Sequence, residues 1–352
     1  MFTAARPGRT SGAVPDAPPV PEVGMDRLVE RHGLPLVVLD IGRAARQYRA
    51  LRSAFPSVDV HYDVSALSHP ALVSAITADG GSFVVSHDGA LEAITRARID
   101  LARVLHATAV VHPHEVLAAY NAGVRRFIVD GTADVEKFVG YPDDLRLLLR
   151  LRSDDPARGA HALPRGIRPL DALRTVRFAA SLGVRVSGFS LNVPPEATPQ
   201  LYVARIARVV ALMADIEAVV GCRFDSIDLG DAFPGTAAVS VADRAELAKA
   251  IRAILAPATS RLSVTASASR AVTADCITVI AGTIERDVDP LLASDCMDEG
   301  AGVAVIGDDG LEAGAAPGDT RPSLLPFFRS VAHTGHRILR TGRRPQTWSS
   351  AG

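Results

Sequence analysis

The chain has 352 residues with a formal net charge of −1, and 48% of them are hydrophobic. This length suits one barrel-sized domain of about 250 residues with a smaller appendage, and the balanced charge excludes the basic surface that attracts nucleic acid or anionic lipid. No apolar stretch reaches the ~18 residues of a membrane span, and three cysteines without metal-like spacing predict free thiols and no metal site. We therefore expect a cytoplasmic protein with neither nucleic acid nor membrane as a partner.

The chain opens on 24 residues that are rich in Pro, Gly, Ala and Thr and show no periodicity. Such a composition cannot bury enough apolar area to offset the entropy that is lost on ordering. We predict a disordered tail over residues 1–24, and Met25 is a candidate for the true start.

Eight short runs rich in Val, Ile, Leu and Phe then alternate with segments of helical period, which is typical of βα units around a buried parallel sheet. The runs are 58–64, 82–86, 103–107, 126–130, 145–151, 185–191, 224–229 and 261–266. Helices are expected between them, for example over 69–79, 113–122, 169–182, 199–220 and 241–255. A (β/α)8 barrel over residues 25–270 is the first choice, and a doubly wound open sheet is the alternative because counting units does not show closure.

Two more strand-like segments flank these units, LPLVVLD at 34–40 and DCITVIAG at 275–282. They can pair with each other in a small second domain. Beyond Glu285 the sequence is rich in Gly, Asp, Ala and Pro with weak periodicity, so residues 271–352 are predicted to form a truncated C-terminal β region and a mobile tail.

The active site of such a barrel lies at the C-terminal ends of its strands. Polar residues gather there, namely Asp63, Ser65, Arg150, Asn192, Asp231, Ser267, Ser269 and Arg270. The catalytic candidates are Asp63, Ser65 and Asp231, with an aspartate as acid or base, and the other five are candidates for substrate binding, in which Arg150 or Arg270 binds a carboxylate. The alternative is that these residues only make local hydrogen bonds. No residue is a candidate metal ligand.

The same strand ends resemble the pyridoxal-phosphate (PLP) dependent ornithine, diaminopimelate and arginine decarboxylases of fold type III. Their F-Y-A-V-K-x-N strand is similar to residues 61–67 (HYDVSAL), where Ser65 stands at the PLP lysine. Their D-I-G-G-G-F-P-G turn is similar to residues 228–235 (DLGDAFPG), and their A-E-P-G-R to residues 266–270 (ASASR). The resemblance covers about residues 34–285 and implies the alanine racemase-like barrel.

Within this resemblance the PLP contacts are altered. A Schiff base needs an amine, and Lys137 and Lys249 are both predicted in helices outside the barrel. Asp231 places a negative charge in a turn whose N–H groups would hold phosphate, and Ser267 replaces the glutamate that binds the ring nitrogen. The stacking histidine is missing from residues 191–195 (LNVPP). We therefore expect that PLP is not a cofactor.

Three functions remain open at this point. The first is a PLP-independent, degenerate homologue that binds or transforms a small metabolite in specialised metabolism. The second is a non-catalytic pseudoenzyme that regulates an active decarboxylase homologue as a heterodimer, although the family also implies homodimers. The antizyme inhibitors likewise resemble decarboxylases without working as one. The third is a PLP-dependent amino-acid decarboxylase, a lyase that would hold PLP non-covalently.

Overall fold

The computed structural model describes residues 22–33, 36–67, 69–86, 88–107, 112–152, 165–193, 198–230, 233, 241–256, 261–274, 276–282, 302–306 and 337–341. They belong to two compact units, one formed by residues 48–271 and the other by residues 1–47 with 272–352. Residues 1–21 of the predicted tail lie outside the described residues, whereas its last three residues belong to the helix α1 (Glu22–His32).

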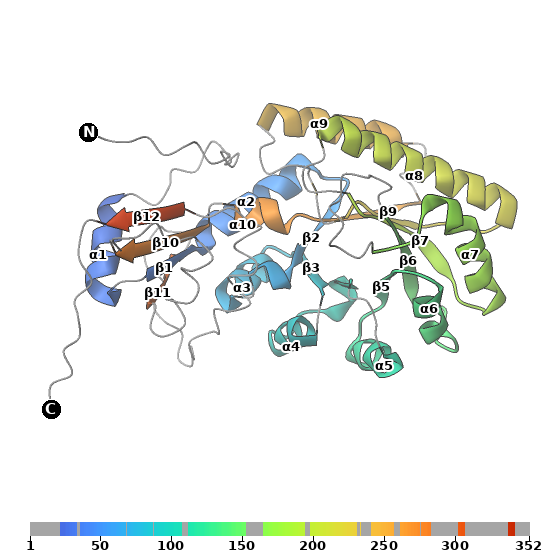
Figure 1. The fold of residues 1–352 in the computed structure, drawn as a ribbon, viewed down its shortest axis with the longest axis horizontal. Coiled ribbons are helices and arrows are strands. Elements are labelled where there is room, and N and C mark those ends of the chain that lie inside the picture. The colour runs from blue at the N-terminus through green and yellow to red at the C-terminus, as the bar shows by residue number, and fades with distance from the viewer. Residues whose placement is uncertain are drawn as a thin grey trace. The chain divides into compact units, whose positions relative to one another are not determined.

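Eight parallel strands form a closed barrel in the first unit, in the order β2-β3-β4-β5-β6-β7-β8-β9 (Figure 1). They are β2 (Asp59–Asp63), β3 (Ser82–Val85), β4 (Val104–His106), β5 (Arg126–Val129), β6 (Arg146–Leu151), β7 (Val186–Leu191), β8 (Ser226–Asp228) and β9 (Ser263–Ser267). Each strand lies within or overlaps a run that the sequence pattern predicts. Pairing of β2 with β9 closes the sheet, so the (β/α)8 barrel is confirmed and the open doubly wound sheet is wrong.

Helices connect successive strands of the barrel. They are α3 (Pro70–Ala78), α4 (Asp88–Arg96), α5 (Pro113–Ala122), α6 (Thr132–Val135), α7 (Ala172–Ser181), α8 (Pro199–Val220) and α9 (Val241–Leu255), with α10 (Ser269–Thr273) after β9 and short 3-10 turns η1 (Val64–Ala66), η2 (Leu101–Arg103), η3 (Glu136–Phe138) and η4 (Pro169–Asp171). The Thr198 side chain caps α8 by accepting from Leu201 N. Gly123 and Gly221 end α5 and α8 in the left-handed conformation, where a side chain would be strained.

Apolar side chains fill the interior of the barrel below its mouth, and polar side chains lie at the C-terminal ends of the strands. Val84, Leu105, Ile128 and Leu148 form a buried cluster contributed by four consecutive strands. Ala107 packs against the cluster and leads to the polar residues at the strand ends. The cluster therefore serves as an apolar layer beneath the barrel mouth.

The second unit contains a four-stranded sheet in the order β11-β1-β10-β12. Its strands are β1 (Leu36–Asp40), β10 (Ile277–Gly282), β11 (Gly302–Ile306) and β12 (Arg337–Thr341), and the helix α2 (Ile41–Ala54) follows β1. β1 pairs antiparallel with β10, which confirms the predicted pairing of the two flanking segments. Among the described residues, no helix combines the length and the apolarity that crossing a bilayer demands.

We predict that Gly188→Ala strongly destabilises the barrel. Gly188 lies opposite Ser226 on β8, and a Cβ atom at this glycine would lie 1.7 Å from the carbonyl oxygen of Ser226. Because backbone must move to relieve this contact, we expect the free energy of unfolding to fall by about 3 kcal/mol in a urea titration. Gly131→Ala is the matched control, since its nearest atom is 3.9 Å away. Equal stability of the two variants would contradict the strand register.

Candidate functional site

A cavity of about 290 Å³ lies at the C-terminal end of the barrel, and residues from all eight strands or the positions just beyond them line it. Its apolar wall comes from Val84, Leu105 and Ile128 of the buried cluster with Ala107 and Leu191, and its polar wall comes from Asp63, Ser86, Arg150, Arg165, Ser190, Asn192, Asp228 and Ser267. This volume is at the lower end of the range for small-molecule sites. The cavity therefore suits a compact polar ligand.

The end of β2 carries a cluster of two serines and an aspartate. Ser65 donates from its backbone N and from Oγ to Asp63 Oδ1, at 2.9 and 2.5 Å. Ser86 Oγ, at the end of β3, donates to Ser65 Oγ at 2.8 Å. Both hydroxyl protons are thus used inside the cluster, which presents oxygen acceptors to the cavity through Asp63 and Ser86.

The end of β9 is joined to that of β2 by a hydrogen bond from Asp63 N to Ser269 Oγ of 2.7 Å. Ser267 Oγ lies 3.3 Å from Ser269 Oγ, and Ser267 lines the cavity while Ser269 supports it from behind. Arg270 lies on α10 and is not one of the described residues that line the cavity.

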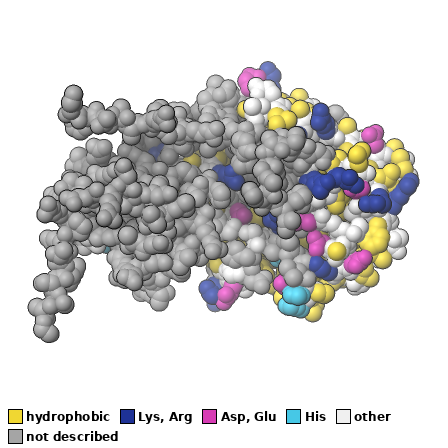
Figure 2. Space-filling view, in the orientation of Figure 1, with side chains coloured by type: hydrophobic (Ala, Val, Ile, Leu, Met, Phe, Trp, Pro, Cys, Tyr) yellow, Lys and Arg dark blue, Asp and Glu magenta, His cyan; other side chains and the backbone are white. Residues whose placement is uncertain are grey.

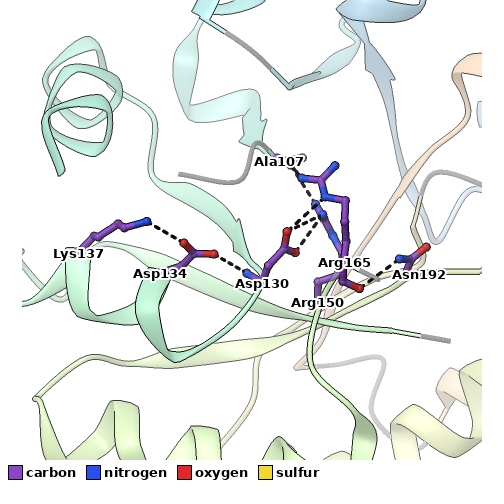
Figure 3. A network of polar contacts seen from close by, with 7 residues as sticks. All are labelled: Ala107, Asp130, Asp134, Lys137, Arg150, Arg165 and Asn192. Atoms are coloured by element: carbon purple, nitrogen blue, oxygen red, sulfur yellow. Dashed lines mark hydrogen bonds and ion pairs between the residues drawn. The ribbon is translucent and has the colours of Figure 1, made fainter. Parts of the chain in front are cut away.

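Two arginines share one carboxylate on the other side of the mouth (Figure 3). Arg150 of β6 and Arg165, which follows β6 in the chain, both bind Asp130 at the end of β5, with Nη1 to Oδ1 at 3.0 Å and Nε to Oδ2 at 3.3 Å. Both also donate to the carbonyl oxygen of Ala107, at 2.9 and 3.3 Å. Asn192 Nδ2 donates to the Arg165 carbonyl oxygen at 3.4 Å. Among the described residues, two guanidinium groups thus share one carboxylate on this wall.

The backbone around Arg165 requires glycine at the next position. Gly166 has φ +92°, and a Cβ atom there would lie 2.5 Å from the Arg150 carbonyl oxygen. That oxygen accepts from Ile167 N at 2.9 Å, while Arg152 N donates to the Ile167 carbonyl at 2.9 Å. This close approach of residues 165–167 to β6 holds the Arg165 side chain beside that of Arg150.

Asp228, the last residue of β8, is a buried carboxyl group in the cavity wall. Ser190 Oγ donates to its Oδ2 at 2.6 Å and Thr265 Oγ1 to its Oδ1 at 3.2 Å. Burial raises the pKa of Asp228 to about 6, although these hydrogen bonds and the charge of Arg150 act in the opposite direction. The carboxyl therefore titrates close to neutral pH.

Four histidines of the barrel unit do not line the cavity. His61 and His106 are buried in β2 and β4, and burial lowers the pKa of His61 to about 4. His112 and His114 are exposed at the start of α5, and the described residues contain no group of three or more His, Cys, Asp or Glu side chains that could hold a metal ion. Asp231 lies outside the described residues.

Sequence reasoning missed Asp130, Arg165 and Asp228 as site residues. Asp130 is the last residue of the predicted strand 126–130 and Asp228 the last but one of 224–229, so the rule that selected Asp63 would have selected them as well. The sequence gave no indication of Arg165, because its position in the cavity depends on the pairing of residues 165–167 with β6.

Residues 41–274 match the family model of the pyridoxal-dependent decarboxylases, in their pyridoxal binding domain. The chain belongs to this family. The resemblance that the strand-end motifs carry is therefore confirmed.

Curated relatives of the family match at low identity. Antizyme inhibitor 2 of Xenopus laevis is 23% identical over 200 residues, which are 56% of this chain and 44% of the relative. The lysine/ornithine decarboxylase of Selenomonas ruminantium is 22% identical over 208 residues, 59% of this chain and 53% of the relative. The diaminopimelate decarboxylase of Actinosynnema pretiosum subsp. auranticum is 28% identical over 220 residues, 58% and 49%. The chain spans about half the length of the curated relatives it matches.

Solved structures show the same fold. The lysine/ornithine decarboxylase of Vibrio vulnificus, complexed with cadaverine, superposes with a TM-score of 0.63 at 21% identity, over 91% of this chain and 98% of that chain. SrLDC in complex with PLP and cadaverine superposes with a TM-score of 0.61 at 19% identity, over 74% and 71%.

The prediction that PLP is not a cofactor is wrong in the light of the family. The matching family model is that of a pyridoxal binding domain, and a structural neighbour was solved with PLP. The missing lysine removes only the covalent bond to PLP. The prediction wrongly concluded from it that PLP is not a cofactor at all.

We predict that Asp228→Asn stabilises the barrel at neutral pH and leaves it unchanged in acid. The folded-state pKa of about 6 exceeds the unfolded value of 3.8, so the stability that the protonated carboxyl contributes is full below about pH 4 and is lost as the pH rises through about 6. The neutral amide avoids this loss, which is about 3 kcal/mol for a shift of about two units. Urea unfolding of the variant and of the unaltered protein at about pH 4 and pH 7.5 measures this difference in the free energy of unfolding.

The exposed carboxyl Asp215 on α8 is the control, and Asp215→Asn should leave this pH dependence in place. A pH profile of Asp228→Asn that parallels the unaltered protein would contradict the assignment of the titration to Asp228.

Proposed function

We propose that this chain binds a small anionic molecule, bearing a phosphate or a carboxylate, at the barrel mouth, and that it does not form the lysine-linked adduct of the decarboxylases. The observation that carries the proposal is the pair Arg150 and Arg165 on the cavity wall, held by Asp130. Arg150 is largely buried, with 10% of its side chain exposed. PLP, whose phosphate is such an anion, is one candidate ligand.

The described residues do not fit a Schiff base with PLP. By the motif, the lysine position is Ser65, whose hydroxyl is engaged with Asp63 and Ser86. Lys137 forms an ion pair with Asp134 at 2.9 Å, and Lys249 is exposed on α9. Neither lysine lines the cavity, so a covalent amine-dependent step has no group to start from.

The cavity instead favours a ligand with two unlike ends. The guanidinium groups reach the ends of β4 and β5, where they contact Ala107 and Asp130, whereas the Asp63 cluster occupies the ends of β2 and β3. An anionic group binds the two arginines through charge-assisted hydrogen bonds, which contribute about 1.5–3 kcal/mol each. A hydrogen-bond donor at the other end reaches Asp63 and Ser86.

The decisive test is calorimetric titration with PLP, inorganic phosphate and succinate. We expect at least one of these anions to bind, and Arg150→Ala and Arg165→Ala to weaken it by about tenfold or more, because each removes a charged donor. Arg174→Ala, with 79% of that side chain exposed on α7, is the control and should leave binding unchanged.

Borohydride reduction in the presence of PLP, followed by mass spectrometry, tests the covalent part. We expect no mass increase on any peptide of the chain. A reduced adduct on Lys137 or Lys249, or failure of all three anions to bind, would contradict the proposal.

A second candidate function is regulation of a decarboxylase homologue by heterodimer formation. The observation in its favour is the similarity to antizyme inhibitor 2 of Xenopus laevis, at 23% identity. We expect, on this alternative, that the tagged chain co-purifies with a decarboxylase of the family from the same cells and changes its rate of product formation. A chain that elutes alone, with no effect on that rate, would eliminate the alternative.

A further inference from the structure

Two residues behind the barrel mouth, Asp134 and Lys137, continue the polar network of the two arginines (Figure 3). Asp130 N donates to Asp134 Oδ2 at 2.9 Å, and Lys137 Nζ donates to Asp134 Oδ1 at 2.9 Å. Asp130, Asp134 and Lys137 are not among the described residues that line the cavity. They therefore form a layer behind the guanidinium groups of Arg150 and Arg165.

The turn from β5 into α6 explains the contact between the two aspartates. Asp130 directly follows β5, and Gly131 is the N-cap of α6, so Asp134 is the third residue of this helix. In a capping box the side chain at this position accepts from the backbone N–H of the N-cap residue. Here it reaches one residue further, to Asp130 N, and only 14% of the Asp134 side chain is exposed. This charge-assisted hydrogen bond fixes the backbone of Asp130 relative to α6.

The backbone of Asp130 carries the carboxylate to which both arginines bind. Arg150 Nη1 lies 3.0 Å from Oδ1, and Arg165 Nε lies 3.3 Å from Oδ2. Because both oxygens are used, a rotation of the carboxylate would break at least one of these contacts. Half of the Arg165 side chain is exposed, so its contact with Asp130 limits a long side chain that otherwise has many rotamers.

Lys137 compensates the charge of the second carboxylate. Asp130 and Asp134 are four residues apart and are linked through one N–H group, so their negative charges repel unless cations offset them. Asp130 binds two guanidinium groups, and Asp134 binds the ammonium group of Lys137, whose side chain is only 18% exposed. Each carboxylate is therefore held next to a cation.

We propose that Asp134 is a positioning residue of the anion site, which fixes Asp130 and, through it, the directions of the Arg150 and Arg165 guanidinium groups. The effect on affinity rests on the proposed function, whereas the effect on the side-chain arrangement does not. If charge alone acted, removing a carboxylate near an anion site would strengthen anion binding. A positioning role predicts the opposite sign, because the guanidinium groups lose their orientation.

Calorimetric titration of PLP, inorganic phosphate and succinate into variants of the full chain tests the effect on affinity. Asp134→Ala should weaken binding by about fivefold or more, because two long side chains must then be ordered on binding. Asp134→Asn should stay within about twofold of the unaltered protein, because its amide oxygen still accepts from Asp130 N. In the Asp130→Ala background Asp134→Ala should have no further effect, since it acts through Asp130.

Glu136→Ala is the matched control for the loss of one negative charge. Glu136 is exposed at the end of α6, two residues from Asp134. Figure 2 shows acidic and basic side chains interspersed on the described surface of the barrel. One exposed carboxylate among them is screened by solvent and salt, so the affinity should change by less than about twofold. Urea unfolding checks that each variant is folded, and Asp134→Ser replaces Asp134→Ala if the latter does not fold.

Crystal structures of Asp134→Ala and Asp134→Asn test the arrangement without a ligand. We expect the Asp130 carboxylate to lose at least one arginine contact in Asp134→Ala and to keep both in Asp134→Asn. Intact contacts in Asp134→Ala, or an anion affinity that is unchanged or increased, would overturn the proposal. If none of the three anions binds the unaltered protein, the proposed function fails, and the crystal structures alone decide whether Asp134 positions the arginines.

Discussion

Pairing between the first and last barrel strands, β2 and β9, is the constraint on which the site depends. Parallel strands need long crossover connections, so a closed ring of eight brings together residues that are far apart in the chain. The hydrogen bond from Asp63 N to Ser269 Oγ joins residues 206 positions apart. Once the ring is closed, the C-terminal ends of all the strands share one rim, and their side chains enclose the cavity. Without closure, Asp63 and Arg150 would lie at distant points of an open sheet.

The sequence alone was sufficient to predict the strands, since period and composition distinguish a buried parallel strand from its neighbouring helices. It also placed Asp63, Ser65, Arg150, Asn192 and Ser267 near one another, because the rule for strand ends depends only on where strands stop. Closure could not be deduced in this way. It depends on a pairing between the two ends of the ring, which no local pattern encodes.

The contacts of Arg165 were beyond sequence reasoning for a similar reason. The side chain reaches Asp130 and Ala107 only because residues 165–167 return to β6, and this return depends on Gly166 fitting against the Arg150 carbonyl. The raised pKa of Asp228 also follows from burial in three dimensions rather than from its neighbours in the chain. The position of a residue at the end of a strand identifies it as a candidate site residue. Its charge state and its contacts depend on burial and on neighbours that come together only in the folded structure.

The absence of an amine at position 65 and the binding of a cofactor are separate physical questions. A lysine supplies one covalent bond, while affinity for an anion comes from charge and hydrogen bonds that other residues provide. Ser65 removes the covalent bond. On the proposed function the affinity for an anion remains, because Arg150 and Arg165 line the same cavity. The family to which the chain belongs is therefore compatible with a site that holds an anion without bonding to it.

The charge of the cavity depends on whether the buried carboxyl group of Asp228 is protonated. Burial raises the pKa of Asp228, whereas hydrogen bonds from Ser190, Gly230 and Thr265 lower it, and the charge of Arg150 adds a smaller effect in the same direction, so the value of about 6 is the balance of all of these. An anion bound to Arg150 would offset the attraction between that guanidinium and the Asp228 carboxylate, and would raise the pKa of Asp228 further. By linkage, protonation of Asp228 must then strengthen anion binding by the same free energy. On the proposed function, protonation of the buried carboxyl of β8 therefore favours the bound anion as the pH falls through about 6.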